Sequence, residues 1–241
     1  MMTISTAFLV CAGLGTRMKP LTDTCPKPLL PLNGRPLLDY IFDHLRATSV
    51  RNVIVNSHHL PAAMEHYLAT ITDFTILPSY EPVLLETGGG LVKALSAHAA
   101  TVGDSPLLMI NGDAFWTDNP AGPPTLTALE SAYDPEKMDI LLCLIPVERM
   151  RLTEGVGDYD LLPDGRIRRN PDKHGTHMFT GIRILNPAIM AGYTEEKFSF
   201  LKNMDAAQEK NKLYGYVMEG DWHHISTPLD LQNVEKHLVD I

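Results

Sequence analysis

The chain has 241 residues, and 44% of them are hydrophobic, which is enough to bury a full core as one domain. Its net charge of −9 argues against nucleic acid as a partner, and it contains no run of eighteen apolar residues that would cross a membrane. The three cysteines are odd in number and far apart, and the first residues lack the basic region of a secretory signal, so we expect a cytoplasmic protein without disulfides.

Positive charge is concentrated near the N-terminus. Residues 1–38 hold four basic side chains against Asp23 alone, a net charge of +3, so the remaining residues carry −12. Such a local excess on an acidic protein is typical of a site for a small anionic substrate.

The first half of the chain alternates short apolar runs with amphipathic stretches, which predicts a largely parallel sheet covered by helices on both faces. The predicted strands are Ala7–Val10, Asn52–Asn56, Phe74–Leu77, Pro106–Asn111 and Met138–Val147. The predicted helices are Pro36–Thr48, Pro61–Thr70, Gly90–Ala100 and Pro124–Tyr133.

The second half has a different pattern. Asp164-Gly165 between two short apolar runs predicts a hairpin of Tyr159–Leu162 with Arg166–Arg168. Beyond it we expect strands at His177–Leu185 and Leu213–Met218 and helices at Lys197–Asn211 and Thr227–Val239. No linker or internal repeat divides the chain, so we expect a single domain over residues 1–241.

The most specific signal is the segment Phe8–Leu32, which reads FLVCAGLGTRMKPLTDTCPKPLLPL. A strand enters a turn containing Gly13 and Gly15, where backbone N–H groups can approach an anion because no Cβ intervenes. Arg17 and Lys27 follow in a loop stiffened by prolines. Together these features predict a polyphosphate site.

Two better-known phosphate motifs do not fit this segment. A dinucleotide fingerprint needs a third glycine where Met18 stands, and a Walker A loop needs Gly-Lys-Ser/Thr after four spacer residues. The pattern G-x-G-T-R-M-x-P-L-T-x-x-x-P-K-P-L instead resembles the signature of sugar-1-phosphate nucleotidyltransferases. Cys11 departs from it, since the family usually has alanine there.

This resemblance implies a Rossmann-like three-layer α/β/α fold with a mixed, mostly parallel central sheet, and no C-terminal β-helix, because no hexapeptide repeat is present. It also implies that the chain is an enzyme that joins an NTP to a sugar 1-phosphate, with a nucleotide-binding half of about 1–120 and a sugar-binding half of about 121–241. Arg17, Lys27 and Asp113 would be its catalytic residues. Ala12, Gly13, Gly15, Thr16, Arg17 and Lys27 would hold the nucleotide.

Asn111-Gly112-Asp113 ends a strongly apolar strand. Ligands of open α/β sheets bind at the carboxyl ends of the strands, so Asp113 is expected at the same edge as the glycine turn, where a carboxylate suits Mg²⁺. The resemblance assigns it the same metal-binding role. Asn56 ends another strand and is a further candidate at this edge.

The run Glu86-Thr87-Gly88-Gly89-Gly90 precedes a predicted helix. Glycines at a helix N-terminus allow close contact with a base or phosphate. In relatives this loop contacts the base, so Glu86 and Gly88 are candidates for base recognition. The sequence E-T-G-G-G especially resembles the corresponding run of uridylyltransferases that act on N-acetylmuramic acid 1-phosphate.

The segment around Trp222-His223-His224 resembles the family motif W-x-D-x-G-T, whose aspartate is the second metal ligand. Here His224 occupies that position. Imidazole is a softer ligand than carboxylate. His224 therefore either ligates the metal, with Mn²⁺ as an alternative to Mg²⁺, or bonds a metal-bound water, or takes no part.

Three residues are candidates for the sugar side because of their places in the family pattern: Asn111, Asp158 and Gly181. Lys173 is an alternative holder of the sugar phosphate.

The first choice of reaction is uridylyl transfer to N-acetylmuramic acid 1-phosphate in cell-wall recycling, by a monomer or small homo-oligomer acting on small molecules. Guanylyl transfer to mannose or heptose 1-phosphate is second, and uridylyl or thymidylyl transfer to glucose 1-phosphate third. A non-catalytic nucleotide-sugar-binding subunit is disfavoured because Arg17, Lys27 and Asp113 are all kept. A Rossmann oxidoreductase is disfavoured because Met18 stands where the dinucleotide fingerprint needs its third glycine.

Overall fold

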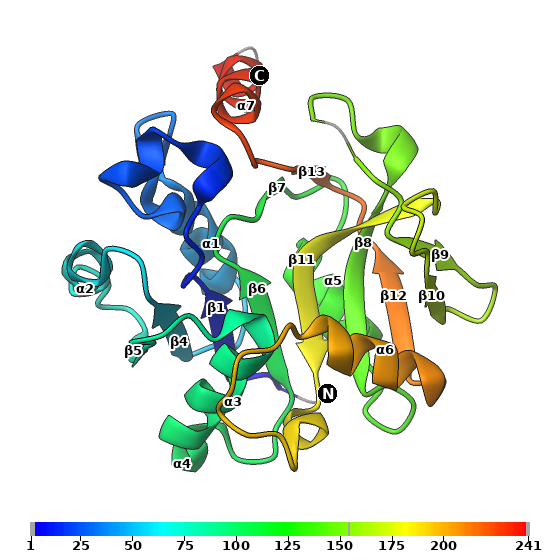
Figure 1. Cartoon of the computed structure of the whole chain (residues 1–241). Coiled ribbons are helices and arrows are strands. Elements are labelled where there is room, and N and C mark those ends of the chain that lie inside the picture. Colours follow the sequence, from blue (N-terminus) through cyan, green and yellow to red (C-terminus); the bar gives the residue numbers. More distant parts are fainter. Residues whose placement is uncertain (1–2, 154, 240–241) are drawn as a thin grey trace.

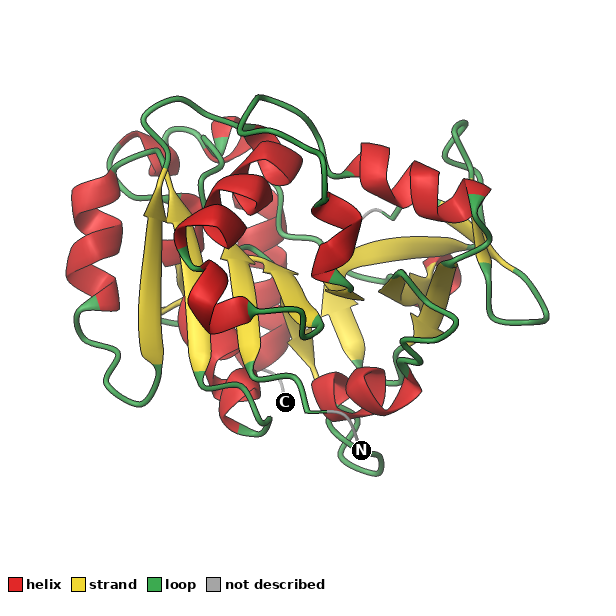
Figure 2. Cartoon of the chain, turned by 90° about the horizontal axis from the view of Figure 1, so that it is seen from below, coloured by secondary structure: helices red, strands yellow, loops and turns green. Residues whose placement is uncertain are grey.

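A nine-stranded mixed sheet runs through the middle of the molecule, and helices cover both of its faces (Figure 1; Figure 2). The computed structural model describes residues 3–153 and 155–239. The strands are β1 (Thr6–Val10), β2 (Pro31–Leu32), β3 (Arg35–Pro36), β4 (Asn52–Ser57), β5 (Thr75–Tyr80), β6 (Leu107–Asn111), β7 (Phe115–Thr117), β8 (Ile140–Pro146), β9 (Tyr159–Leu161), β10 (Ile167–Arg169), β11 (His177–Leu185), β12 (Leu213–Val217) and β13 (Asp221–His223). The helices are α1 (Leu37–Arg46), α2 (Pro61–Leu68), α3 (Glu86–Ala97), α4 (Ala99–Val102), α5 (Thr125–Ala132), α6 (Leu201–Glu209) and α7 (Pro228–Val239).

The sheet has a parallel part and an antiparallel part, and β11 joins them. Strands β5, β4, β1 and β6 are parallel neighbours in that order. β11 runs antiparallel to both β6 and β8, and β12 then pairs parallel with β8. The predicted hairpin forms as β9 with β10, beside the start of β11. The predicted α/β class, with a mixed and mostly parallel sheet, is confirmed.

Strand residues alternate between two hydrophobic cores, as the period of two in a strand requires. On β1, Leu9 faces the core beneath α1, α2 and α5, while Phe8 faces the core beneath α3 and α6. Neighbouring strands repeat this alternation: Val53 lies in the first core and Ile54 in the second. Burial on both faces explains why these strands are continuous apolar runs.

A third, smaller core lies outside the sheet, beneath the N-terminal loop. Met18, Leu30 and Leu32 of that loop pack against Ile225 and Val234 from the end of the chain. The proline-rich loop is therefore held by apolar contacts with the segment that contains α7, which lies beside it in Figure 1.

The glycine-rich helix begins earlier than the sequence predicts. The predicted range was Gly90–Ala100, but α3 starts at Glu86, so the three glycines lie inside its first turns. The backbone N–H groups of Gly88 and Gly89 donate to the carbonyl of Phe198, at 2.9 and 3.3 Å. The glycines serve close packing, because a Cβ at Gly89 would collide with the Glu196 carbonyl oxygen.

Smaller differences occur elsewhere. The predicted helix Lys197–Asn211 begins only at Leu201, and the ribbon of β7 with β13 was not predicted. In the described residues, no helix is long and apolar enough to cross a bilayer.

The close packing of α3 gives a stability test. Gly89→Ala should lower the free energy of unfolding by about 1–3 kcal/mol, because the methyl group must displace a backbone carbonyl. Ser96→Ala is the matched control, since Ser96 is exposed on the same helix and its loss should change stability by about 0.5 kcal/mol at most. Urea unfolding measures both variants, and equal stabilities would contradict this account of the glycines.

Candidate active site

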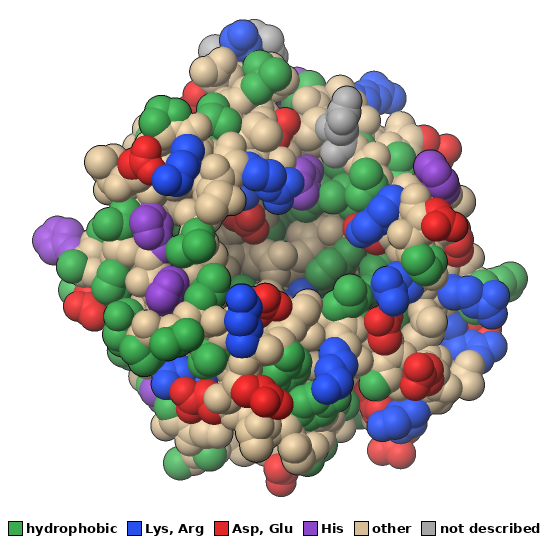
Figure 3. All heavy atoms as spheres, in the orientation of Figure 1, with side chains coloured by type: hydrophobic (Ala, Val, Ile, Leu, Met, Phe, Trp, Pro, Cys, Tyr) green, Lys and Arg blue, Asp and Glu red, His purple; other side chains and the backbone are tan. Residues whose placement is uncertain are grey.

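A hollow opens at the carboxyl ends of β1 and β6, and basic side chains stand around its rim (Figure 3). It divides into three adjoining cavities that share residues, and Asn111 at the end of β6 lines all three. The place agrees with the rule that open α/β sheets bind ligands beyond the carboxyl ends of their strands.

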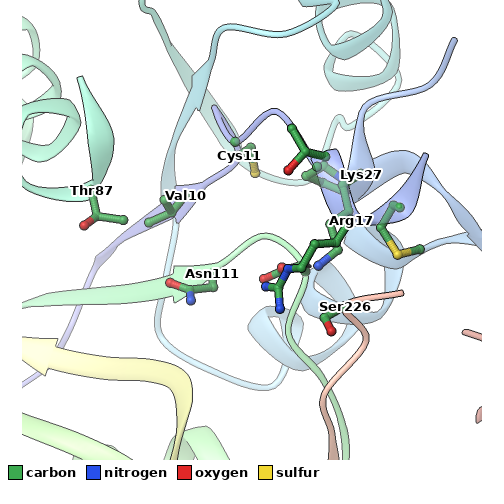
Figure 4. A pocket seen from close by; sticks show the side chains of 13 residues that line it. Val10, Cys11, Arg17, Lys27, Thr87, Asn111 and Ser226 are labelled. Atoms are coloured by element: carbon green, nitrogen blue, oxygen red, sulfur yellow. Dashed lines mark hydrogen bonds and ion pairs between the residues drawn. The ribbon is translucent and has the colours of Figure 1, made fainter. Parts of the chain in front are cut away.

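The first cavity lies between the N-terminal loop and β6 (Figure 4). It brings the glycine turn and both predicted cations of the N-terminal segment together with Asp113, which is far from them in the sequence. Its lining residues are Val10, Cys11, Gly13, Gly15, Thr16, Arg17, Met18, Lys27, Pro28, Thr87, Asn111, Asp113 and Ser226.

The turn after β1 is shaped by Gly15. Its φ of 61° lies in the left-handed region, and a Cβ there would lie 2.8 Å from Thr22 Cγ2. Thr22 Oγ1 also donates to the Gly15 carbonyl at 2.9 Å. The short 3-10 helix Thr16–Met18 follows at once, and Met18 anchors it in the third core.

Lys27 and Asp113 form an ion pair on the wall of the cavity. Their Nζ and Oδ2 atoms are 2.5 Å apart, and Lys27 is only 9% exposed, whereas the Asp113 side chain keeps 39% of its surface. Arg17 is exposed on the same wall and makes no ion pair with a residue in the described ranges. This wall therefore carries two positive charges against one negative charge, which suits a polyanion.

Cys11 lines this cavity but is not a nucleophile. Burial, with a smaller effect from the charge of Asp113, raises the pKa of its thiol well above the ordinary value. The thiol therefore stays protonated near pH 7.

The second cavity contains Asp113 together with His224, so the two predicted metal ligands face one space. Burial lowers the pKa of His224, against the smaller opposing effect of Asp113, so its imidazole is neutral near pH 7 and able to ligate. Residues 3–153 and 155–239 hold no group of three His, Cys, Asp or Glu side chains placed for a metal. A carboxylate and an imidazole fit a divalent ion only where substrate oxygens and water complete its shell, as is common for Mg²⁺.

The sugar candidates Asn111, Asp158 and Gly181 line this second cavity as well. Gly181 has a φ of 82°, and a Cβ there would lie 2.9 Å from Asn111 Nδ2. The Asn111 Oδ1 atom is buried and has no hydrogen-bond partner among the described residues, so it can accept a bond from a ligand. Lys173, the alternative phosphate holder, also lines this cavity and forms an ion pair with Asp158.

Four predicted nucleotide-binding residues do not line the three cavities. Ala12 and Gly88 are buried, and Glu86 forms an ion pair with Lys197 at 3.7 Å. Asn56 is 1% exposed, and both ends of its amide are used within the protein. It accepts from the Cys11 backbone N–H at 2.6 Å and donates to the buried Glu81 at 2.7 Å.

Two polar side chains that line the first cavity, those of Thr87 and Ser226, were not predicted as site residues. Thr87 reaches the first and third cavities, and its hydroxyl accepts a bond from the Phe200 backbone at 2.9 Å. Ser226 closes the first cavity from the end of the chain, and its hydroxyl bonds to Asp230 of α7. Thr87 lies inside the E-T-G-G-G run, which was the sequence signal for this part of the site. From that run the sequence analysis selected the neighbours of Thr87, Glu86 and Gly88.

Comparisons with known proteins identify the family of the chain. Residues 6–168 match the family model described as "Nucleotidyl transferase". The N-acetylmuramate alpha-1-phosphate uridylyltransferase of Caulobacter vibrioides is 31% identical over 228 residues, covering 92% of each chain. The D-glycero-alpha-D-manno-heptose 1-phosphate guanylyltransferase of Aneurinibacillus thermoaerophilus is 26% identical, covering 96% of this chain and 97% of that protein.

Among solved structures, a UDP-glucose pyrophosphorylase from Acinetobacter baumannii superimposes with a TM-score of 0.76 at 19% identity, covering 98% of this chain and 93% of the other. That likeness shows the fold. The chain belongs to the nucleotidyl transferase family. Within it, the protein is a sugar-1-phosphate nucleotidyltransferase, as the sequence pattern predicted.

The buried place of Asn56 yields a second test. Asn56→Ala should lower the free energy of unfolding by about 1–3 kcal/mol, because the buried Glu81 carboxylate and the Cys11 N–H each lose a partner. Gln232→Ala is the matched control, because Gln232 is exposed and carries the same amide group on a side chain one methylene longer. This substitution should leave the free energy of unfolding unchanged. A stable Asn56→Ala protein with a raised KM for nucleotide would instead show that Asn56 contacts the substrate.

Proposed function

We propose that the protein transfers a uridylyl group from UTP to N-acetylmuramic acid 1-phosphate, releasing pyrophosphate, and serves cell-wall recycling. The observation that carries the reaction type is the cavity in which the glycine turn, Arg17, Lys27 and Asp113 meet. The choice of substrates is supported by the E-T-G-G-G run and by the relative from Caulobacter vibrioides.

The reaction needs no protein nucleophile. The second pKa of a phosphate monoester is about 6, so the attacking oxygen of the sugar phosphate is already largely ionised. This oxygen forms a bond to the α-phosphorus, the bond from that phosphorus to the bridging oxygen breaks, and pyrophosphate leaves with the electron pair. The protein must therefore align two anions and stabilise their charge, and alignment alone can contribute roughly 7–11 kcal/mol.

The first cavity would hold the triphosphate. Backbone N–H groups of residues 13–16 and the Arg17 guanidinium would bind the β- and γ-phosphates. Lys27 would lie between the reacting phosphates, because its ammonium is fixed by Asp113 on the cavity wall. Its burial strengthens its attraction for phosphate relative to an exposed lysine.

A divalent ion, Mg²⁺ or alternatively Mn²⁺, fits beside Asp113, with His224 as a second ligand. When bound, it would neutralise charge on the α-phosphate. Asn111, Asp158 and Gly181 would bind the sugar in the adjoining cavity, where the Asn111 carbonyl can accept from a hydroxyl and Asp158 can accept from a hydroxyl or the acyl amide.

The substrate assignment is tested by pyrophosphate release with four NTPs against five sugar 1-phosphates. UTP with N-acetylmuramic acid 1-phosphate should give the highest kcat/KM. A higher value for GTP with mannose or heptose 1-phosphate would replace this assignment with guanylyl transfer, for which the relative from Aneurinibacillus thermoaerophilus is the precedent.

The two cations give a sharper test of the site. Arg17→Ala and Lys27→Ala should each lower kcat/KM more than about tenfold, because charge on the leaving pyrophosphate loses a fixed partner. Lys19→Ala is the matched control: Lys19 lies in the same loop, does not line the cavity and is 61% exposed. Wild-type rates in folded Arg17→Ala and Lys27→Ala proteins would refute these roles.

The role of His224 predicts a metal effect. If His224 ligates the ion, His224→Asp should raise the activity with Mg²⁺ relative to Mn²⁺ by at least about threefold, because a carboxylate favours the harder ion. Steady-state rates at saturating concentrations of each metal measure the ratio. An unchanged ratio in an active variant would exclude ligation by His224.

A further inference from the structure

The strand β11 contains a charged residue in an apolar setting. Arg183 lies between Ile182 and Ile184, is 3% exposed, and pairs in register with Leu142 and Met109. Burial lowers the pKa of its guanidinium to about 9, which still leaves it charged near pH 7. A buried charge is costly unless something pairs with it.

Within the part of the chain that the structure describes, nothing pairs with this guanidinium. Its Nε and Nη2 atoms are buried and donate to no acceptor, and no carboxylate forms an ion pair with it. Its two close neighbours are aromatic, with Cζ 5.3 Å from the ring centre of Phe179 and 4.9 Å from that of Phe200. Both rings stabilise a cation through their π-faces but satisfy none of its N–H groups.

Arg183 lines the third cavity, which continues from the sugar side of the site. Asn111, Asp158, Lys173 and Phe179 line both this cavity and the second one. Two other cations also line the third cavity, but each has a carboxylate partner. Arg169 bonds to Asp205 at 2.6 and 2.9 Å, and Lys173 pairs with Asp158.

We propose that Arg183 binds an anionic substituent of the sugar 1-phosphate, a carboxylate, and so selects acidic sugars over neutral ones. This rests on the proposed function, in which the acceptor is N-acetylmuramic acid 1-phosphate, whose lactyl ether carries a carboxylate. A guanidinium matches a planar carboxylate with two parallel N–H···O bonds. The acceptor's phosphate is not the ligand, because it must reach the first cavity, where the triphosphate reacts.

The test compares two acceptors that differ only in the lactyl ether, N-acetylmuramic acid 1-phosphate and N-acetylglucosamine 1-phosphate, each with UTP. Arg183→Met should raise KM for the acidic acceptor at least about tenfold and leave KM for the neutral acceptor within about twofold. Arg183→Lys keeps the positive charge but cannot form two parallel N–H···O bonds, so its KM for the acidic acceptor should lie between those of the wild type and Arg183→Met. Arg168→Met is the matched control, because Arg168 is exposed on β10 and does not line this cavity.

A structural role predicts a different outcome. Losing Arg183 would then impair both acceptors alike, and equal losses overturn the proposal, as does an unchanged KM for the acidic acceptor. Thermal unfolding adds a second readout: Arg183→Met should melt at or above the wild-type temperature, because the guanidinium has no carboxylate partner to lose. A large drop in melting temperature would also count against the proposal.

Failure of the proposed function is distinguishable from failure of this inference. If the wild type accepts neither acceptor, the comparison is repeated with glucuronic acid 1-phosphate against glucose 1-phosphate and the NTP that the enzyme uses. An Arg183-dependent preference for the acidic member of this pair supports the inference without N-acetylmuramic acid. If the enzyme shows no preference for the acidic member, the inference is overturned.

Discussion

The ion pair between Lys27 and Asp113 is the contact on which the architecture of the site depends. It connects a loop near the N-terminus to the end of β6, and its 2.5 Å length places a lysine ammonium where the glycine turn opens. Lys27 is nearly buried, so the pair lies in a medium where its charges act more strongly than they would in water. The small core under the loop, which includes Met18, keeps the loop in place. Charge is thus positioned by packing that lies outside the main sheet.

Much of the fold could be predicted from the sequence because its central strands are buried on both faces. Runs such as the one ending at Asn111 have no polar alternation, and this identifies them as inner strands of a covered sheet. The start of α3 was misplaced because three consecutive glycines are poor helix formers. Tertiary contacts override that preference, since the Phe198 carbonyl caps the helix and only glycine fits against Glu196. Pairing of β7 with β13 could not be predicted, because each strand has three residues and the two are about a hundred residues apart.

The site could be predicted where a motif places its residues next to one another, and less well where the chain folds back on itself. The glycine turn, Arg17 and Lys27 belong to one segment, and the structure brings them to one cavity with Asp113. Asn56 also stands at the correct edge of the sheet, but its amide faces Glu81 rather than the cavity, and strand periodicity alone does not decide this. The sequence does mark Arg183 as unusual, because it places a charged residue between two isoleucines of a buried strand.

The irregularity of β11 accounts for the space beside Asn111, where we propose that the acceptor binds. From Ile182 to Leu185 this strand pairs with β6, whereas its pairing with β8 shifts register between Phe179 and Arg183. At the start of β11, His177 pairs with Tyr159 of β9. Strands β6 and β11 thus cease to pair beyond Ile110 and Ile182, and Asn111, Phe179 and Gly181 from these strands line the second cavity. Exchanges on its walls can thus alter which acceptor fits while the hydrogen bonds that hold the sheet together are retained.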